Sequence, residues 1–296
     1  MLIEKSIPAS YVVRNVWKDV LTVLVIAIVV ESIIRVSRAY VPEVSIALPT
    51  VLGTAISLIL SFKLAQSYDR WWEARKIWGA IVNDSRTLVR QMLSFPRSPT
   101  PVAARVGRRQ IAWCYSLGQS LRGQNWYSGS EGHLSETDAA ETKRHANKAL
   151  ILIQQHARDI AGLAEHGAIT DFERVTLDAT LTRLVDSMGK AERIRNTVFP
   201  TTYRAFLHAF IYLFITLLSI AVGELTGAWQ VLVTTVISIP FFLLEKTASH
   251  MQDPFSNLPT DTPVTAIART IEINLLQLLG EESVPPPLEP DGYYLM

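Results

Sequence analysis

The chain has 296 residues, of which 49% are hydrophobic and 19% charged, and its formal net charge is +1. Soluble domains are about a quarter charged, so this composition favours a membrane protein with a sizeable polar part. The small net charge argues against nucleic acid as a partner, because a phosphate backbone is bound by an excess of cations. A single cysteine, Cys114, excludes an intramolecular disulfide and a thiolate metal cluster.

The first apolar run is Val20–Val30, which Glu31 interrupts and which resumes weakly to Val36. A secretory signal peptide is one interpretation of a short run preceded by cations. No small-residue cleavage site follows it, however, which favours a retained membrane span. Glu31 and Arg35 are four residues apart and are expected to pair on one helix face, with a purely structural role as the simpler interpretation.

The second apolar run, Val44–Phe62, contains no charged residue. It is long enough, at roughly 1.5 Å per helical residue, to cross a hydrocarbon core of roughly 30 Å. The short link Ser37–Glu43 predicts that residues 20–62 form a transmembrane hairpin, and Pro49 falls in the first turns of its second helix, where proline is tolerated. Polar residues begin at Lys63, where we expect the helix to continue outside the membrane.

One face of the second span carries Thr54, Leu58 and Phe62 at four-residue spacing, which places them in one row. The other small residues of the span are Gly53, Ser57 and Ser61. Two interpretations remain open from spacing alone. Small residues let helix backbones approach, so the face can pack against another helix; alternatively, the row lines a pore.

Residues 63–204 have helical periodicity and no alternating strand pattern. The helices predicted here are residues 78–92, 102–121, 135–165 and 170–196. In the last of them, Thr170 and Asp171 precede Phe172, and Glu173 follows, which is typical of a helix start.

A second hairpin is predicted over residues 205–244, from the apolar runs Ala205–Gly227 and Ala228–Leu244, the latter interrupted near its end by Pro240. Residues 245–296 then contain a loop, a helix over Ile267–Leu279 and a proline-rich tail. Lysine and arginine flank the sides of the spans away from the two short links. The positive-inside rule therefore predicts that both termini are cytoplasmic.

The predicted fold is all-α: a membrane protein with four transmembrane helices in two hairpins and a helical cytoplasmic domain. The predicted segments are a cytoplasmic N-terminal segment (1–19), the first hairpin (20–62), the cytoplasmic domain (63–204), the second hairpin (205–244) and a cytoplasmic C-terminal segment (245–296).

Motifs of nucleotide binding, serine hydrolysis and zinc proteolysis do not occur in the sequence. The six histidines, which have no ligand spacing to one another or to the cysteine, are His133, His145, His156, His166, His208 and His250. The alternating charges Asp69, Arg70, Glu73 and Arg75 are more typical of a solvated or intersubunit helix face than of an acid–base pair. We therefore predict no enzyme activity, no cofactor and no metal site.

Three motifs, in order, resemble the bestrophin family, and in particular its bacterial members. They are Ser67–Gly79 (SYDRWWEARKIWG), Asp253-Pro254-Phe255, and Ile271-Glu272 followed by Asn274-Leu275-Leu276. The two hairpins around a helical domain match the family's organisation as well, so the resemblance covers nearly the whole chain.

The resemblance implies a homopentameric channel of the bacterial inner membrane that passively conducts small monovalent ions. Chloride is the family's ion in animals, and the bacterial branch includes members that conduct sodium or other cations, so the resemblance leaves the ion open. It further implies a neck lined by Thr54, Leu58 and Phe62 and a cytoplasmic exit constriction at Phe172. A membrane-anchored binding or signalling module is the alternative. A secondary transporter is disfavoured, since transporters usually show inverted repeats and midplane charge.

The segment after the fourth span, residues 252–257, lacks the dense acidic run with which animal members bind Ca²⁺. A Ca²⁺ ion takes about six to eight oxygen ligands, several from carboxylates, and Asp253 alone supplies few of them. We therefore expect no activation by Ca²⁺.

Overall fold

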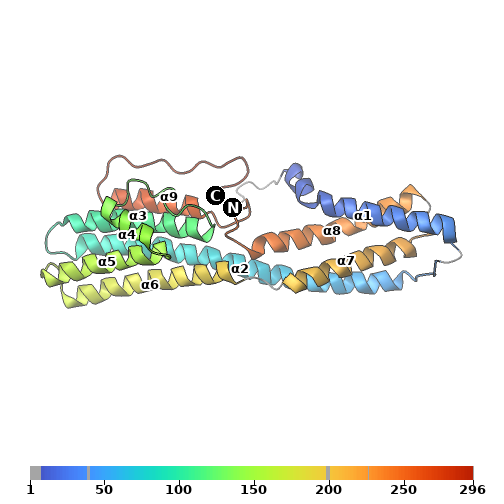
Figure 1. The fold of residues 1–296 in the computed structure, drawn as a ribbon, viewed down its shortest axis with the longest axis horizontal. Helices are drawn as coiled ribbons and strands as arrows, with labels where there is room; N and C mark the ends of the chain where they lie inside the picture. The colour runs from blue at the N-terminus through green and yellow to red at the C-terminus, as the bar shows by residue number, and fades with distance from the viewer. Residues whose placement is uncertain (1–7, 39–40, 198–200, 226, 296) are drawn as a thin grey trace. The chain divides into compact units, whose positions relative to one another are not determined.

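The computed structural model describes residues 8–38, 41–197, 201–225 and 227–295, which form nine α-helices and no strand (Figure 1). The chain divides into two compact units. Of the described residues, the span unit comprises those within 8–70 and 201–252. The bundle unit comprises those within 71–197 and 253–295. The predicted all-α fold is confirmed.

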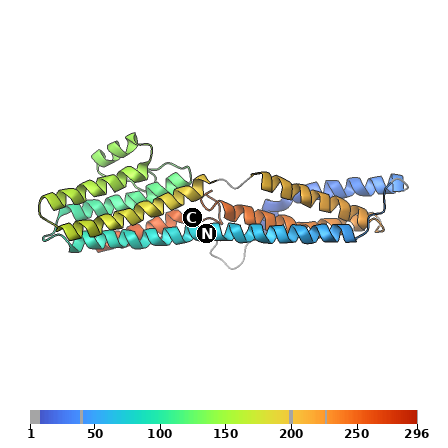
Figure 2. The same cartoon turned by 90° about the horizontal axis from the view of Figure 1, so that it is seen from below.

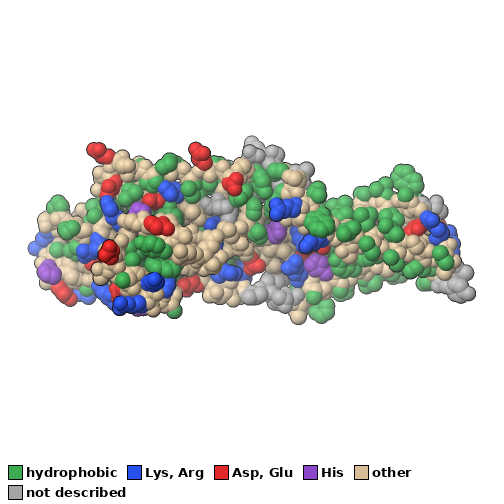
Figure 3. All heavy atoms as spheres, turned by 45° about the horizontal axis from the view of Figure 1, so that its top comes forward, with side chains coloured by type: hydrophobic (Ala, Val, Ile, Leu, Met, Phe, Trp, Pro, Cys, Tyr) green, Lys and Arg blue, Asp and Glu red, His purple; other side chains and the backbone are tan. Residues whose placement is uncertain are grey.

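The span unit contains four helices that are long and apolar enough to cross a membrane. They are α1 (Ala9–Ser37), the first part of α2 (Ala47–Ser94), α7 (Thr201–Ala221) and α8 (Ala228–Gln252). Its small core contains Ile56, Leu60, Ile211, Phe214 and Phe242. Most other apolar side chains of the unit face outward, as the visible surface in Figure 3 shows. This inversion of the usual soluble pattern is expected where lipid is the solvent.

Two helices of the span unit extend beyond the predicted apolar runs. Helix α1 begins at Ala9, before Val20, and α8 continues past Leu244 to Gln252, with Pro240 inside it. Polar residues continue the helices beyond the apolar runs, because helix formation depends on backbone hydrogen bonds and packing as well as on hydropathy. The expected ion pair of Arg35 with Glu31 is present, with Arg35 Nε 3.0 Å from Glu31 Oε1.

Helix α2 is continuous over 48 residues and contributes to both units, as Figure 2 shows. It begins at Ala47, so Pro49 lies in its first turn, where the missing proline N–H would have no helical partner in any case. No glycine or proline interrupts the stretch after Phe62 except Gly79. The predicted continuation of the second span as a polar helix is therefore confirmed.

The bundle unit packs the second part of α2 with α3 (Pro101–Leu121), α4 (Glu136–Arg144), α5 (Lys148–Glu165), α6 (Asp171–Asn196) and α9 (Val264–Leu278). Large side chains that are fully buried in its core include Trp78, Ile81, Leu88, Trp113 and Leu117. Charged side chains of both signs are scattered over the visible face of this unit (Figure 3), as expected for a helical domain in water.

The predicted helix over residues 135–165 is wrong in one respect: the chain breaks into α4 and α5 after Arg144. The side chain of Asn147 caps the second helix by accepting from the Leu150 N–H at 3.0 Å, and Ser135 caps the first in the same way. Asparagine and serine are favoured at such caps. The break lets α4 fold back onto α5.

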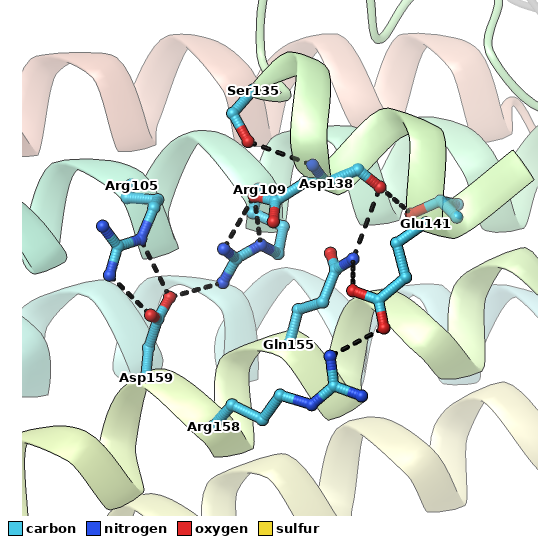
Figure 4. A network of polar contacts seen from close by, with 9 residues as sticks. Arg105, Arg109, Ser135, Asp138, Glu141, Gln155, Arg158 and Asp159 are labelled. Carbon is cyan, nitrogen blue, oxygen red and sulfur yellow. Dashed lines mark hydrogen bonds and ion pairs between the residues drawn. The ribbon is translucent and has the colours of Figure 1, made fainter.

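A polar network fixes α4 against its neighbours (Figure 4). The guanidinium of Arg109, which is buried, bridges Asp138 of α4 at 2.8 Å and Asp159 of α5 at 2.7 Å. Glu141 of α4 accepts from Gln155 and Arg158 of α5. Because the cation and both carboxylates are largely removed from water, each depends on its partner, and the network specifies one docking geometry for α4.

His156 of α5 lies beside this network and is fully buried, and neither ring nitrogen has a hydrogen-bond partner among the described residues. Burial lowers the pKa of His156 to about 3, and the nearby charge of Arg109 lowers it further, whereas Asp159 opposes this. The imidazole is therefore neutral in the folded protein.

We expect His156 to make the folded protein sensitive to acid. As the pH falls from about 6.5 towards 3, the unfolded chain takes up a proton on this ring that the folded chain does not. Stability should therefore decrease by up to about 1.4 kcal/mol per pH unit from this group. The His156→Leu variant should show a shallower fall of the thermal midpoint between neutral and mildly acidic buffer. His145→Gln, which alters an exposed ring, is the matched control; an unchanged slope in His156→Leu contradicts the assignment.

Candidate functional site on the second helix

The apolar part of α2 has two distinct faces. Ile56, Leu60 and Lys63 are buried inside the span unit, with at most 1% of each residue exposed. The opposite face carries Leu58, 59% exposed, and Phe62, 60% exposed. The helical period of 3.6 residues separates the two sets.

The two interpretations of the small residues apply to different positions. A Cβ atom added to Gly53 would lie 3.0 Å from the Phe214 ring of α7, so the glycine permits a close helix contact. Thr54, Leu58 and Phe62, by contrast, lie on the exposed face. They are not buried in the contact with α7 that Gly53 permits. Their role as a neck stays a prediction.

Hydroxyl groups near this row are satisfied within the helix. The Thr54 hydroxyl donates to the Thr50 carbonyl at 2.8 Å, and the Ser57 and Ser61 hydroxyls donate to the carbonyls four residues earlier, at 2.8 and 2.9 Å. The donor of Thr54 is thus directed to the backbone. The row presents a methyl group, an aliphatic side chain and an aromatic ring, and it carries no formal charge.

A buried ion pair lies directly after the row. The ammonium of Lys63 donates to Glu245 Oε1 of α8 at 2.9 Å and to the Ser249 hydroxyl at 2.9 Å, and Glu245 is fully buried. Ser249 also donates to Glu245, at 2.7 Å. Lys63 is the first charged residue after the apolar run, but its side chain is buried within the span unit, which the local sequence pattern does not predict. The available signal was a lone cation beside Phe62 and a lone carboxylate near the end of the fourth run.

Two further nitrogen-bearing side chains lie near the same carboxylate. Arg204 Nε and His208 Nε2, both from α7, lie 3.7 Å from the two oxygens of Glu245. Glu245 therefore connects α2, α7 and α8 through one group. Since Lys63 is adjacent to Phe62 in the helix, holding Lys63 towards α8 fixes the direction in which Phe62 projects.

The predicted exit residue, Phe172, lies in the first turn of α6 and is 88% exposed. The predicted helix start is confirmed, because Thr170 and Glu173 form a reciprocal capping box. The Glu173 carboxylate accepts from the Thr170 backbone N–H at 2.7 Å, which lowers the pKa of Glu173. Phe172 thus projects from a rigid helix terminus, and its role as a constriction stays a prediction.

The other motifs of the resemblance serve to connect helices of the bundle unit. Trp71 Nε1 donates to the Thr260 carbonyl at 2.9 Å. Glu272 accepts from the Tyr115 hydroxyl at 2.7 Å, and Asn274 accepts from Arg86 Nε at 3.0 Å. These contacts give Glu272 and Asn274 of α9 a role in packing.

The loop after α8 does not form a cluster of acidic ligands. Among the described residues, no group of three or more His, Cys, Asp or Glu side chains is placed to hold a metal ion. Asp253 is exposed. Asp261 is buried and accepts from the Leu258 N–H at 3.1 Å, which closes a turn, and burial raises the pKa of Asp261 to about 6.

These features define an all-α membrane protein whose second apolar helix keeps one uncharged row exposed. The profile of the bacterial and fungal bestrophin proteins matches residues 5–277. The chain therefore belongs to the bestrophin family.

Relatives of known name and structure agree with this assignment. The chain is 30% identical, over 83% of its length and 80% of the relative's, to the voltage-dependent anion channel-forming protein YneE of Escherichia coli K12. It is 29% identical to a voltage-dependent anion channel-forming protein of Mesorhizobium japonicum, over 81% of this chain and 76% of that one. The crystal structure of a bacterial bestrophin homologue from Klebsiella pneumoniae matches with a TM-score of 0.84 and 27% identity, covering 90% of this chain and 99% of that one.

The Lys63–Glu245 pair can be tested through stability. Lys63→Met leaves Glu245 buried without its closest cation and should destabilise the protein by about 3–5 kcal/mol, since breaking one partner of a buried pair is costly. The double variant Lys63→Met with Glu245→Leu should recover at least half of the lost thermal midpoint in detergent. Lys246→Met, which removes a partly exposed lysine 3.5 Å from Asp19, is the control and should cost about 1 kcal/mol or less. Equal losses in the single and double variants would contradict the pairing.

Proposed function

We propose that this protein is a homopentameric ion channel that passively conducts small monovalent ions across the bacterial inner membrane. In this proposal the second helices of identical subunits surround a central axis and form a hydrophobic neck from Thr54, Leu58 and Phe62. Phe172 forms a second constriction at the cytoplasmic exit. Both termini and residues 63–204 lie in the cytoplasm.

The observation that carries the proposal is the uncharged row on α2, which is exposed in the single chain although the opposite face is tightly packed. Family membership and the names of the relatives, which are anion channel-forming proteins, support conduction. An exposed apolar row on a membrane helix can also contact lipid. Contact with lipid is expected if the protein has the alternative function, that of a membrane anchor for a helical binding module.

The mechanism follows from the chemistry of the row. A narrow apolar ring excludes water, so an ion crosses it only when the ring is wet or wide enough to keep part of the hydration shell. The methyl of Thr54 and the rings of Phe62 set this barrier, and the fixed rotation of α2 keeps them on the axis. No covalent step and no cofactor is required, which agrees with the predicted lack of enzyme activity.

Leu58→Ala and Phe62→Ala should each raise ion flux from proteoliposomes. A smaller side chain widens the neck, so that an ion can pass while it keeps more of its hydration shell. Conductance measured in planar bilayers should increase several-fold. Leu21→Ala is the matched control, since Leu21 is an exposed apolar residue of α1 (52% exposed) outside the proposed neck.

The oligomeric state is measured on the same samples by native mass spectrometry. Pentamers without flux in the wild type and in both neck variants would favour the anchor. An equal effect of Leu21→Ala and Leu58→Ala would remove the special role of the row.

Calcium should not open the channel. Among the described residues no group of three or more acidic, histidine or cysteine side chains is placed to hold a metal ion, and Asp261 is engaged in a turn, so the loop after α8 offers few oxygen ligands for Ca²⁺. Currents recorded with calcium and with a chelator should agree. A current that rises with calcium in the purified protein would show that this expectation is wrong.

A further inference from the structure

One charged residue of the span unit lies on the same side of α2 as the proposed neck. Asp69 follows Phe62 by seven residues, which is nearly two helical turns, so the two side chains project in nearly the same direction. Like Phe62, Asp69 is exposed. Across the intervening positions the helix is continuous.

The carboxylate of Asp69 has no hydrogen-bond or ion-pair partner among the described residues, whereas its charged neighbours along α2 are engaged. Lys63 is buried against Glu245. Arg70 lies about 100° farther round the helix, is half-buried and takes part in an interaction. Glu73 and Lys76 pair with each other at 2.6 Å. Asp69 is therefore the first uncompensated charge after the neck.

We propose that Asp69 is a determinant of charge selectivity, which raises the permeability of the channel to cations relative to anions. The proposal rests on the proposed function, since it requires that the row from Thr54 to Phe62 faces the axis. One carboxylate from each subunit then forms a ring of negative charge beyond the inner end of the neck.

Distance decides whether such a ring can act. Seven residues of helix place Asp69 about 10 Å beyond Phe62 along the axis. This is about one Debye length at 0.1 M salt, so the field of the ring reaches the end of the neck. The neck row itself is uncharged and cannot oppose it. A ring of like charge concentrates counter-ions and repels co-ions, as in the acidic rings of cation channels.

The test is the cation-to-anion permeability ratio, obtained from reversal potentials in asymmetric NaCl. Asp69→Asn should lower the ratio by about threefold or more, and Asp69→Glu should preserve it. Glu136→Gln removes the same charge from the exposed first turn of α4 and should leave the ratio unchanged. The difference between wild type and Asp69→Asn should shrink at about 1 M salt, where the Debye length is about 3 Å.

A second variant separates electrostatics from assembly. The native Cys114 is fully buried, so Asp69→Cys introduces the one exposed thiol among the described residues. Charged methanethiosulfonate reagents are then applied to channels that have already assembled. A negatively charged adduct should raise the permeability ratio, and a positively charged adduct should lower it.

The outcomes distinguish a failure of the proposed channel function from a failure of the role proposed for Asp69. Wild-type pentamers that conduct no ions overturn the proposed function itself. Conducting channels whose permeability ratio is the same in Asp69→Asn and wild type, or with either adduct on Asp69→Cys, overturn the role of Asp69 alone. A ratio that follows the sign of the charge at position 69 supports it.

Discussion

The buried pair of Lys63 and Glu245 is the constraint on which the proposed pore depends. Both side chains are buried within the span unit, where an uncompensated ion is strongly unfavourable. The pair can form only when α2 turns Lys63 towards α8. Since a helix is rigid in rotation over two turns, this choice also sets the direction of Leu58, Phe62 and Asp69. A polar contact far from the axis thereby orients the residues proposed to lie on it.

Packing strengthens the same constraint. Gly53 allows α7 to approach closely through Phe214, while Ile56 and Leu60 complete the buried face of α2. One chain therefore uses a single face of the helix to hold its own fold and leaves the rest of the apolar part exposed. In the proposed symmetric pentamer the exposed row would meet identical copies of itself around the axis.

Sequence patterns predicted those features that depend on neighbouring residues. Hydropathy located the four spans, Thr170 and Glu173 marked the start of α6, and uninterrupted helical periodicity after Phe62 extended α2. The features that the sequence patterns did not predict depend on interactions between residues far apart in the sequence. Lys63 pairs with a residue 182 positions away, which no local pattern reveals. The break between α4 and α5 depends on Asn147 as a cap and on the docking of α4 through Arg109, which competes with the helical tendency of the segment.

The proposed arrangement would separate two tasks that a narrow conduit must perform. An apolar row controls whether a water column exists at all, but it cannot distinguish the sign of an ion by Coulomb attraction because it has no charge. A carboxylate placed two turns farther along the same helix can make that distinction without entering the constriction, where a bare charge would hold a counter-ion too tightly for it to leave. Selectivity by a nearby ring, at about one Debye length, keeps the neck itself free of strong binding. The two functions can then vary independently, by changing Phe62 or Asp69, while the buried pair that orients both stays the same.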